Sequence, residues 1–250
     1  MSDARFTYIL RLADANLILA QRLGELIGHA PALEEDLGLA NIGLDLMGQA
    51  RMLLTYAGEL EGAGRTEDTL AFFREHRDFL NPTLVEQPNG DFGRTIARQF
   101  LFDAWQMELY ERLQQSTDER LAAIAGKALK ETRYHLRYSA NWIVRLGDGT
   151  QESHDRVQRA FDELWQYVAE LFEADAIDAE MVDAGVAADP EAMRVGWNTT
   201  VNEVLAQATL RRPVDRRFQW WGKRGDHSEH LGPMLAEMQY MQRTYPGAQW

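Results

Sequence analysis

Uninterrupted helical periodicity is the feature that most constrains the fold of this chain. Apolar residues recur three and four positions apart through four long stretches, none of which contains Pro, and Gly or Pro residues follow three of them. No stretch alternates β-branched residues for long enough to propose a strand. The predicted long helices cover residues 4–28, 33–60, 92–115 and 116–146. Helices of roughly 25 residues are about 38 Å long, which is typical of a helical bundle.

Local signals place shorter helices around these four. Gly28 and Pro31 end the first long helix, and Ser116 with Glu119 forms a plausible capping box at the start of the fourth. The shorter helices are predicted to start at Thr66, at Thr150 with an end near Ala174, at Asp189-Pro190 and at Gly232-Pro233. We therefore expect an all-α chain with long core helices and additional shorter ones, folded as a single domain over residues 1–250.

Composition excludes several classes of function. With 45% hydrophobic residues in 250, the chain can bury a sizeable core. Its net charge of -13 would repel nucleic acid and an anionic membrane surface. Because there is no Cys, disulfides, thiolate metal sites and a cysteine nucleophile are excluded. Arg5, Arg11 and Asp14 interrupt the apolar N-terminal residues, so we expect neither a signal peptide nor a membrane span, and a cytoplasmic location.

The second long helix is apolar nearly all round, and we expect it to be central and buried. One narrow polar line runs along it, formed by Asn41, Asp45 and Gln49 at intervals of four. That line either faces a polar site inside the bundle or is satisfied by neighbouring side chains and water.

Helical bundles often hold di-iron sites, which need a Glu-x-x-His motif on each of two helices. The six His of this chain are preceded at that spacing by Leu26, Phe73, Thr132, Gln151, Arg224 and His227, and none of these is acidic. Glu131 and His135 stand four apart and can both reach inward, with Asp103 on the preceding long helix. We favour a hydrogen-bonded structural pair, a relic of a ligand sphere, over a metal site built on these residues. No motif for a flavin, nicotinamide or phosphate is present.

One basic segment stands out against the acidic whole. The stretch RRPVDRRFQWWGKRG has a net charge of +5 and includes Phe218, Trp220 and Trp221. It is predicted to bind an acidic partner surface, to bind the phosphates of a ligand such as coenzyme A, or to be a solvated loop over buried Trp side chains. Its basic residues are Arg211, Arg212, Arg216, Arg217, Lys223 and Arg224.

Several long stretches resemble one known family along essentially the whole chain. They include LGELIGHAPALEEDLGLANIGLDLMGQARMLL, LVEQPNGDFGRTIARQFLFDAW, KALKETRYHLRYS and HSEHLGPMLAEMQYMQR. These stretches are similar to the C subunits of bacterial multicomponent phenylacetyl-CoA 1,2-epoxidases, the ring monooxygenases of phenylacetate degradation. The resemblance implies a ferritin-like helical protein that acts as a structural subunit.

In such an assembly, the resemblance implies, the catalytic A subunit holds the di-iron centre and the CoA thioester. A reductase subunit with flavin and an iron-sulfur cluster supplies electrons from NADPH, and a small B subunit joins A–C pairs. No ligand residue carries over to this chain, so Asp45, Asp103, Glu131 and His135 are expected to be vestigial interior positions, and no cofactor is expected here. The basic segment at 211–217 is not part of the family pattern. Two alternatives stay open: an independent metal-dependent oxygenase with an unconventional site, and a homodimeric module that binds a CoA ester.

Overall fold

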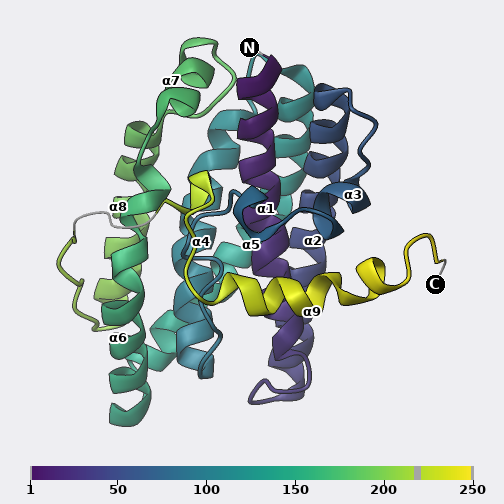
Figure 1. Cartoon of the computed structure of the whole chain (residues 1–250). Coiled ribbons are helices and arrows are strands. Elements are labelled where there is room, and N and C mark those ends of the chain that lie inside the picture. The colour runs from purple at the N-terminus through teal and green to yellow at the C-terminus, as the bar shows by residue number, and fades with distance from the viewer. Residues whose placement is uncertain (1, 217–220, 249–250) are drawn as a thin grey trace. The chain divides into compact units, whose positions relative to one another are not determined.

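The computed structural model describes residues 2–216 and 221–248. They form two compact units, of which the first is the described part of residues 1–88 and 220–250 and the second is residues 89–219. The predicted all-α class is confirmed, since the described residues form helices and no strand, with one isolated bridge between Trp221 and Asp226. Figure 1 shows the helices of both units.

The first unit is built on two long helices that pack along each other, α1 (Ser2–Leu26) and α2 (Leu33–Glu61). A short helix, α3 (Glu67–Phe72), and a single 3-10 turn, His76–Asp78, follow α2. The last helix, α9 (Leu231–Thr244), packs against α3 and that turn (Figure 1). A second 3-10 turn, Gly222–Arg224, precedes α9. Both ends of the described chain therefore belong to this unit.

The buried helix of the first unit is α1, and the prediction that α2 is buried all round is wrong. Every residue from Tyr8 to Ala20 is buried. In α2, the buried face includes Leu39, Ile42 and Leu46, whereas Leu44 on the other side is 70% exposed. Apolar periodicity reports how many faces of a helix are apolar, but it does not report how many faces the rest of the chain covers.

The second unit surrounds α4 (Phe92–Leu113), whose residues 95–106 are all buried. This helix packs against α5 (Glu119–Gly147), α6 (Gln151–Leu164) and α8 (Pro190–Gln207). A further short helix, α7 (Ala176–Asp183), lies between α6 and α8 in the sequence.

The helix predicted to run from Thr150 to about Ala174 is shorter in the structure. It ends at Leu164 and continues as the 3-10 turns Trp165–Tyr167 and Ala169–Phe172. These turns bring Trp165 and Phe172 to the same buried ring, Trp197 of α8, with centroids 5.6 and 5.4 Å from it. Packing of large aromatic side chains accompanies the early end of α6.

Capping residues begin most helices as predicted. Thr66, Thr150 and Asp189 each accept a hydrogen bond from a backbone N–H in the first turn of their helix. At α5 the predicted capping box is wrong, because Asp118 is the cap and accepts from Leu121 N at 3.0 Å. Ser116 instead donates to Val186 O at 2.8 Å and accepts from Asp118 N. Its hydroxyl therefore ties the α4–α5 loop to the segment after α7.

Candidate functional site

The predicted interior residues Asp103 and His135 are brought together in the second unit. Asp103 on α4 and His135 on α5 are both fully buried. Two neighbours hold the Asp103 carboxyl group: Gln99 Nε2 donates to Oδ1 at 2.7 Å, and Ser139 Oγ donates to Oδ2 at 2.7 Å. Gln99 stands one turn before Asp103, and Ser139 one turn after His135, so the cluster follows from the spacing of two facing helices.

Burial decides the acidity of this carboxyl group. Burial raises the pKa of Asp103 to about 6, and the charge of His135 with the hydrogen bonds from Ser139 and Gln99 opposes that rise without cancelling it. The carboxyl group therefore exchanges its proton at mildly acidic pH. Both oxygens of this buried carboxyl group are hydrogen-bonded, so its raised pKa fits a structural role as well as a chemical one.

Amide and hydroxyl groups continue the polar interior beyond Asp103. Thr132 Oγ1 lies 3.3 Å from Gln106 Oε1 and 3.1 Å from Ala128 O. The Gln106 amide in turn lies 3.5 Å from the hydroxyl of Tyr110. All three polar residues, Thr132, Gln106 and Tyr110, are fully buried. At these positions α4 and α5 present amide and hydroxyl groups, whereas hard cations such as iron prefer carboxylate ligands.

The other two predicted interior positions are only partly buried. Glu131 is half-buried on α5, and Asp45 is half-buried on α2, in the first unit. Of the polar line on α2, Asn41 is exposed and only Gln49 is fully buried. The line therefore does not face an interior site along its length.

The residues present do not fit a di-iron centre. Such a centre needs several carboxylates with lone pairs directed at the cations, and both Asp103 oxygens already accept hydrogen bonds from Gln99 and Ser139. Within residues 2–216 and 221–248, no three His, Asp or Glu side chains gather where they could hold a metal ion.

The basic segment divides between the two units, and its first two Arg are bound to their own unit. Arg211 donates to both carboxylate oxygens of Asp162 at 3.0 Å. Arg212 stacks over Trp165, 5.0 Å from the ring centroid, and donates to Asn202 and Asn198 at 2.7 and 2.9 Å. These contacts fasten the segment after α8 to the rest of the second unit.

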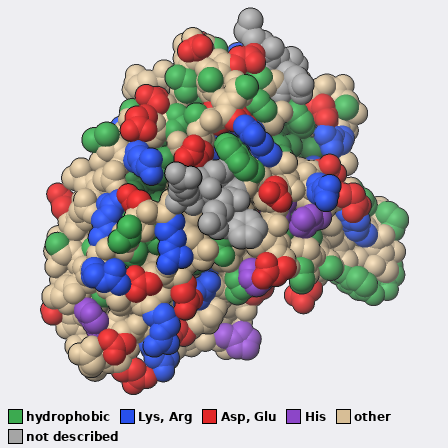
Figure 2. Space-filling model, turned by 60° about the vertical axis from the view of Figure 1, so that its left-hand side comes forward, with side chains coloured by type: hydrophobic (Ala, Val, Ile, Leu, Met, Phe, Trp, Pro, Cys, Tyr) green, Lys and Arg blue, Asp and Glu red, His purple; other side chains and the backbone are tan. Residues whose placement is uncertain are grey.

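The other basic residues of the segment are Arg216, Arg217, Lys223 and Arg224. Arg216 is exposed, and Arg217 lies outside the described residues, as does Trp220. Lys223 and Arg224 belong to the first unit, where the Arg224 guanidinium lies 3.9 Å from the centroid of the Trp221 ring. The face in Figure 2 intersperses Lys and Arg with Asp and Glu. This arrangement is typical of a solvated surface.

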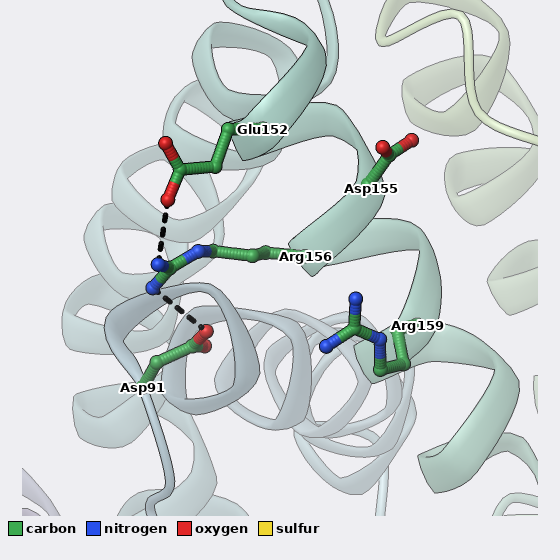
Figure 3. A pocket seen from close by; sticks show the side chains of 5 residues that line it. All are labelled: Asp91, Glu152, Asp155, Arg156 and Arg159. Carbon is green, nitrogen blue, oxygen red and sulfur yellow. Dashed lines mark hydrogen bonds and ion pairs between the residues drawn. The ribbon is translucent and has the colours of Figure 1, made fainter.

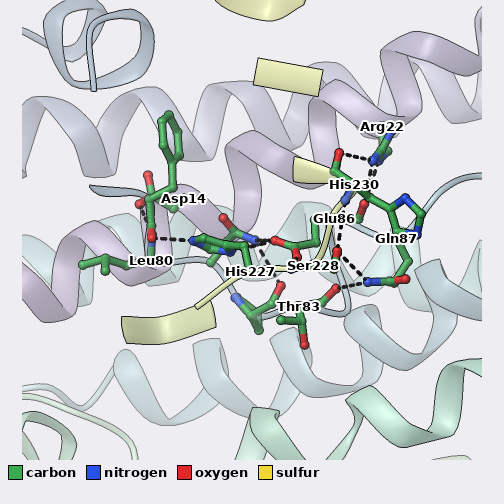
Figure 4. Close-up of polar contacts among 12 residues, drawn as sticks. Asp14, Arg22, Leu80, Thr83, Glu86, Gln87, His227, Ser228 and His230 are labelled. Carbon is green, nitrogen blue, oxygen red and sulfur yellow. Dashed lines mark hydrogen bonds and ion pairs between the residues drawn. The ribbon is translucent and has the colours of Figure 1, made fainter. Parts of the chain in front are cut away.

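A second buried polar cluster, in the first unit, escaped the sequence analysis. The fully buried carboxylate of Glu86 accepts hydrogen bonds from Ser228 N at 2.6 Å and from Asn81 Nδ2 at 2.9 Å, and lies 2.8 Å from His227 Nδ1. The other ring nitrogen of His227 donates to Phe79 O at 2.7 Å. Two acceptors thus face the two ring nitrogens, which suits an imidazolium ion (Figure 4).

The cluster around Glu86 binds two distant parts of the sequence together. Arg22 of α1 donates to the backbone oxygens of Glu86 and His230, at 2.7 and 3.1 Å. Burial lowers the pKa of the nearby His76, and the charge of His227, whose ring is 5.2 Å away, lowers it further. Glu86 and His227 are 141 residues apart, so no local spacing could have indicated the contact. In the sequence, Glu86 is only one acid between Leu84-Val85 and Gln87-Pro88.

A surface hollow lies where α4 begins beside α6 (Figure 3). Its lining is charged: Arg156 lies 2.6 Å from Glu152 and 3.5 Å from Asp91, and Asp155 and Arg159 complete the wall. Both signs of charge line the hollow, and all five side chains are exposed. Three acidic and two basic side chains line it, so it has the character of a surface ion-pair network rather than of a site for one charged ligand.

Comparison with known proteins shows the family of this chain. A family model described as "Phenylacetic acid catabolic protein" matches residues 1–250. The chain belongs to this family. It is 56% identical over 243 residues to the C subunit of the 1,2-phenylacetyl-CoA epoxidase of Escherichia coli (strain K12), covering 97% of this chain and 98% of that protein.

Among solved structures, the chain resembles "Protein 19 with aldehyde deformylating oxidase activity" from Synechococcus. The TM-score is 0.56 and the sequence identity 15%, over 82% of this chain and 94% of that one. At this identity the likeness concerns the fold alone, and it confirms the predicted ferritin-like helical fold. None of the helices in the described part of the chain is long and apolar enough to cross a membrane.

Proposed function

We propose that this chain is the C subunit of a phenylacetyl-CoA 1,2-epoxidase, a structural subunit that itself performs no chemistry. The observation that carries the proposal is the 56% identity to the Escherichia coli protein over 97% of the chain. Similarity of this extent, which also covers 98% of that protein, supports the same place in the same kind of assembly.

The interior of the second unit supports the non-catalytic part of the proposal. A ferritin-like catalytic subunit would direct carboxylates and His side chains at two cations between its long helices. At the corresponding kind of position this chain has Asp103, whose oxygens accept from Gln99 and Ser139, followed by Gln106, Thr132 and Tyr110. A hydrogen-bonded interior holds the helices together without a metal ion.

The partner is the di-iron catalytic A subunit, which also binds the CoA thioester. Interior carboxylates around a metal site are costly to desolvate, and a large interface with a second subunit offsets part of that cost. The assembly is completed by a small B subunit and by a reductase with flavin and an iron-sulfur cluster. This chain supplies none of these cofactors.

Coexpression with the A subunit tests the proposal. We expect the two chains to elute together on size exclusion at micromolar concentration, with iron in the complex and less than about 0.1 iron per chain when this chain is purified alone. Separate elution of the two chains would contradict the proposal that the A subunit is the partner. About two iron per isolated chain, together with oxygenase activity, would contradict the structural role.

A further inference from the structure

One outward line of α2 consists of apolar side chains at heptad spacing. Leu33, Leu37, Ala40, Leu44 and Met47 follow one another at intervals of four, three, four and three residues. The four large ones are 69, 56, 70 and 40% exposed, in that order. We call these five residues the α2 seam.

The α2 seam has no partner within its own helix pair. α2 packs on α1 through its opposite face, where Leu39, Ile42, Leu46 and Leu53 are at most 1% exposed. Single exposed apolar residues are ordinary on a protein surface, but a continuous line of them marks an interaction site. Alternating spacings of three and four let the side chains of two helices interlock, so a helix is the element that fits this line.

We propose that the α2 seam binds the α2 seam of a second copy of this chain, with the two helices antiparallel. In the register that pairs the seams, Leu37 of one copy faces Met47 of the other, and Ala40 faces Leu44. Each contact occurs twice, as a two-fold axis requires. The small Ala40 makes room for the larger Leu44, so neither layer leaves a gap or a clash.

Charge favours the same register. It places Arg51, which continues the heptad spacing one turn beyond Met47, across from Leu33 and next to Glu34 of the other copy. The Arg51 side chain is 75% exposed, and its intramolecular ion pair with Glu67 has a length of 3.4 Å. Because exposed ion pairs are weak, Arg51 can turn to an acid of the other copy. A parallel pair would instead set Arg51 against Arg51 and Ala40 against Ala40, leaving a repulsion and a gap.

The size of the seam sets the strength of the pair. From Leu33 to Arg51 the line is about 27 Å long. Four large side chains per copy bury roughly half of the ~800 Å² per partner that a standard interface buries. We therefore expect a reversible dimer with a dissociation constant of roughly 10 to 100 µM. It forms from this chain alone and needs no catalytic subunit.

Sedimentation of the purified full-length chain from about 1 to 300 µM measures the association. We expect a monomer–dimer equilibrium for the wild type and a monomer throughout for the Leu37→Glu/Leu44→Glu variant, with unchanged circular dichroism because both positions are exposed. Val195→Glu is the matched control: Val195 is 67% exposed on α8, outside the seam, and its replacement leaves the dimer intact. A wild type that stays monomeric overturns the proposal, as does a dimer that persists in the Leu37→Glu/Leu44→Glu variant.

Cross-linking tests the register, because the chain has no native Cys. Leu37→Cys and Met47→Cys, which are ten residues or about 15 Å apart along the helix, are made in separate chains and treated with a short bismaleimide at about 200 µM, above the expected dissociation constant. The antiparallel register predicts at least tenfold faster cross-linking in the mixture of the two chains than in either alone. Equal rates in the mixture and in the single variants overturn it. So does a monomeric wild type whose Leu37→Glu/Leu44→Glu variant loses the A subunit, since the seam then belongs to that partner.

Discussion

Asp103 costs the folded protein stability at neutral pH. Its folded pKa of about 6 is above the ordinary value of 3.8, so between these two pH values the folded state keeps a proton that the unfolded state releases. The stabilising contribution of the protonated form is complete below the unfolded pKa and is lost as the pH rises through the folded pKa. At pH 7 the buried charge is therefore a net cost.

Asp103→Asn removes that cost. An amide at this position can accept from Gln99 Nε2 and donate to Ser139 Oγ, which then donates to His135 O, now 3.0 Å away. We expect the free energy of unfolding in urea to rise by about 2 kcal/mol at pH 7.5. The gain should shrink as the pH is lowered to 5.5, and Asp155→Asn on the surface provides the control. A variant that is less stable than the wild type at both pH values would mean that the ionised Asp103 is held by His135.

Asp14 and Arg74 form a buried ion pair in the first unit. Their side chains are 0 and 3% exposed, and Arg74 Nη1 donates to Asp14 Oδ2 at 2.9 Å. Leu80 N donates to the same oxygen at 2.8 Å, so the carboxylate also holds the segment after the 3-10 turn His76–Asp78. From the sequence, Asp14 indicated only that the apolar N-terminal residues are interrupted by charge, because its partner lies 60 residues away.

Removing one member of this pair leaves the other charge buried and uncompensated. We expect Asp14→Ala to lower the free energy of unfolding by about 3 to 5 kcal/mol, and Asp14→Leu combined with Arg74→Met to lower it much less. Urea denaturation of the three proteins measures both effects. Glu152→Gln, which breaks the exposed pair with Arg156, is the control and should have little effect. Equal losses in the single and double variants would contradict the ion-pair argument.

At the scale of elements, periodicity predicted the helices well and their environment poorly. The long helices lie within a few residues of the expected ranges, because breakers and caps such as Thr150 and Asp189 act locally. Which helix is central depends on contacts that periodicity does not encode. α1, interrupted by Arg11 and Asp14, is buried because those charges have partners in distant segments, whereas α2 keeps one apolar face exposed.

The contact between Glu86 and His227 holds the segment before α4 to the segment before α9. Glu86→Gln keeps the shape but removes the charge that three donors share, so we expect a loss of about 2 to 3 kcal/mol in the free energy of unfolding. Limited proteolysis should then cut within residues 221–231 more rapidly than in the wild type. Glu229→Gln, whose side chain is 81% exposed next to His230, is the matched control. Unchanged proteolysis in Glu86→Gln would show that other contacts hold this segment.

For the whole molecule, the fold and the family could be predicted from the sequence, and the grouping of the candidate residues could not. Asp103 and His135 do meet, since facing helices at a regular spacing bring interior positions together. Asp45 belongs to the other unit, and the basic residues from Arg211 to Arg224 divide between both units. Closeness in sequence suggested that the basic residues act together, and helical spacing suggested that the interior polar residues do. Neither signal shows where the chain passes from one compact unit to the other.

The interior residues of α5 decide between a structural subunit and an independent oxygenase. Glu131→Gln/His135→Gln removes the carboxylate and the imidazole that such an oxygenase would need, while leaving polar groups of similar size in the bundle. We expect this variant to unfold at a lower temperature, since His135 is fully buried, and to support wild-type epoxidase turnover per assembled complex with the A subunit and reductase. Turnover is therefore measured on complex isolated by size exclusion, so that lost assembly is not mistaken for lost chemistry. A turnover below about 1% of the wild-type value in intact complex would place a reacting group in this chain and would contradict a purely structural subunit.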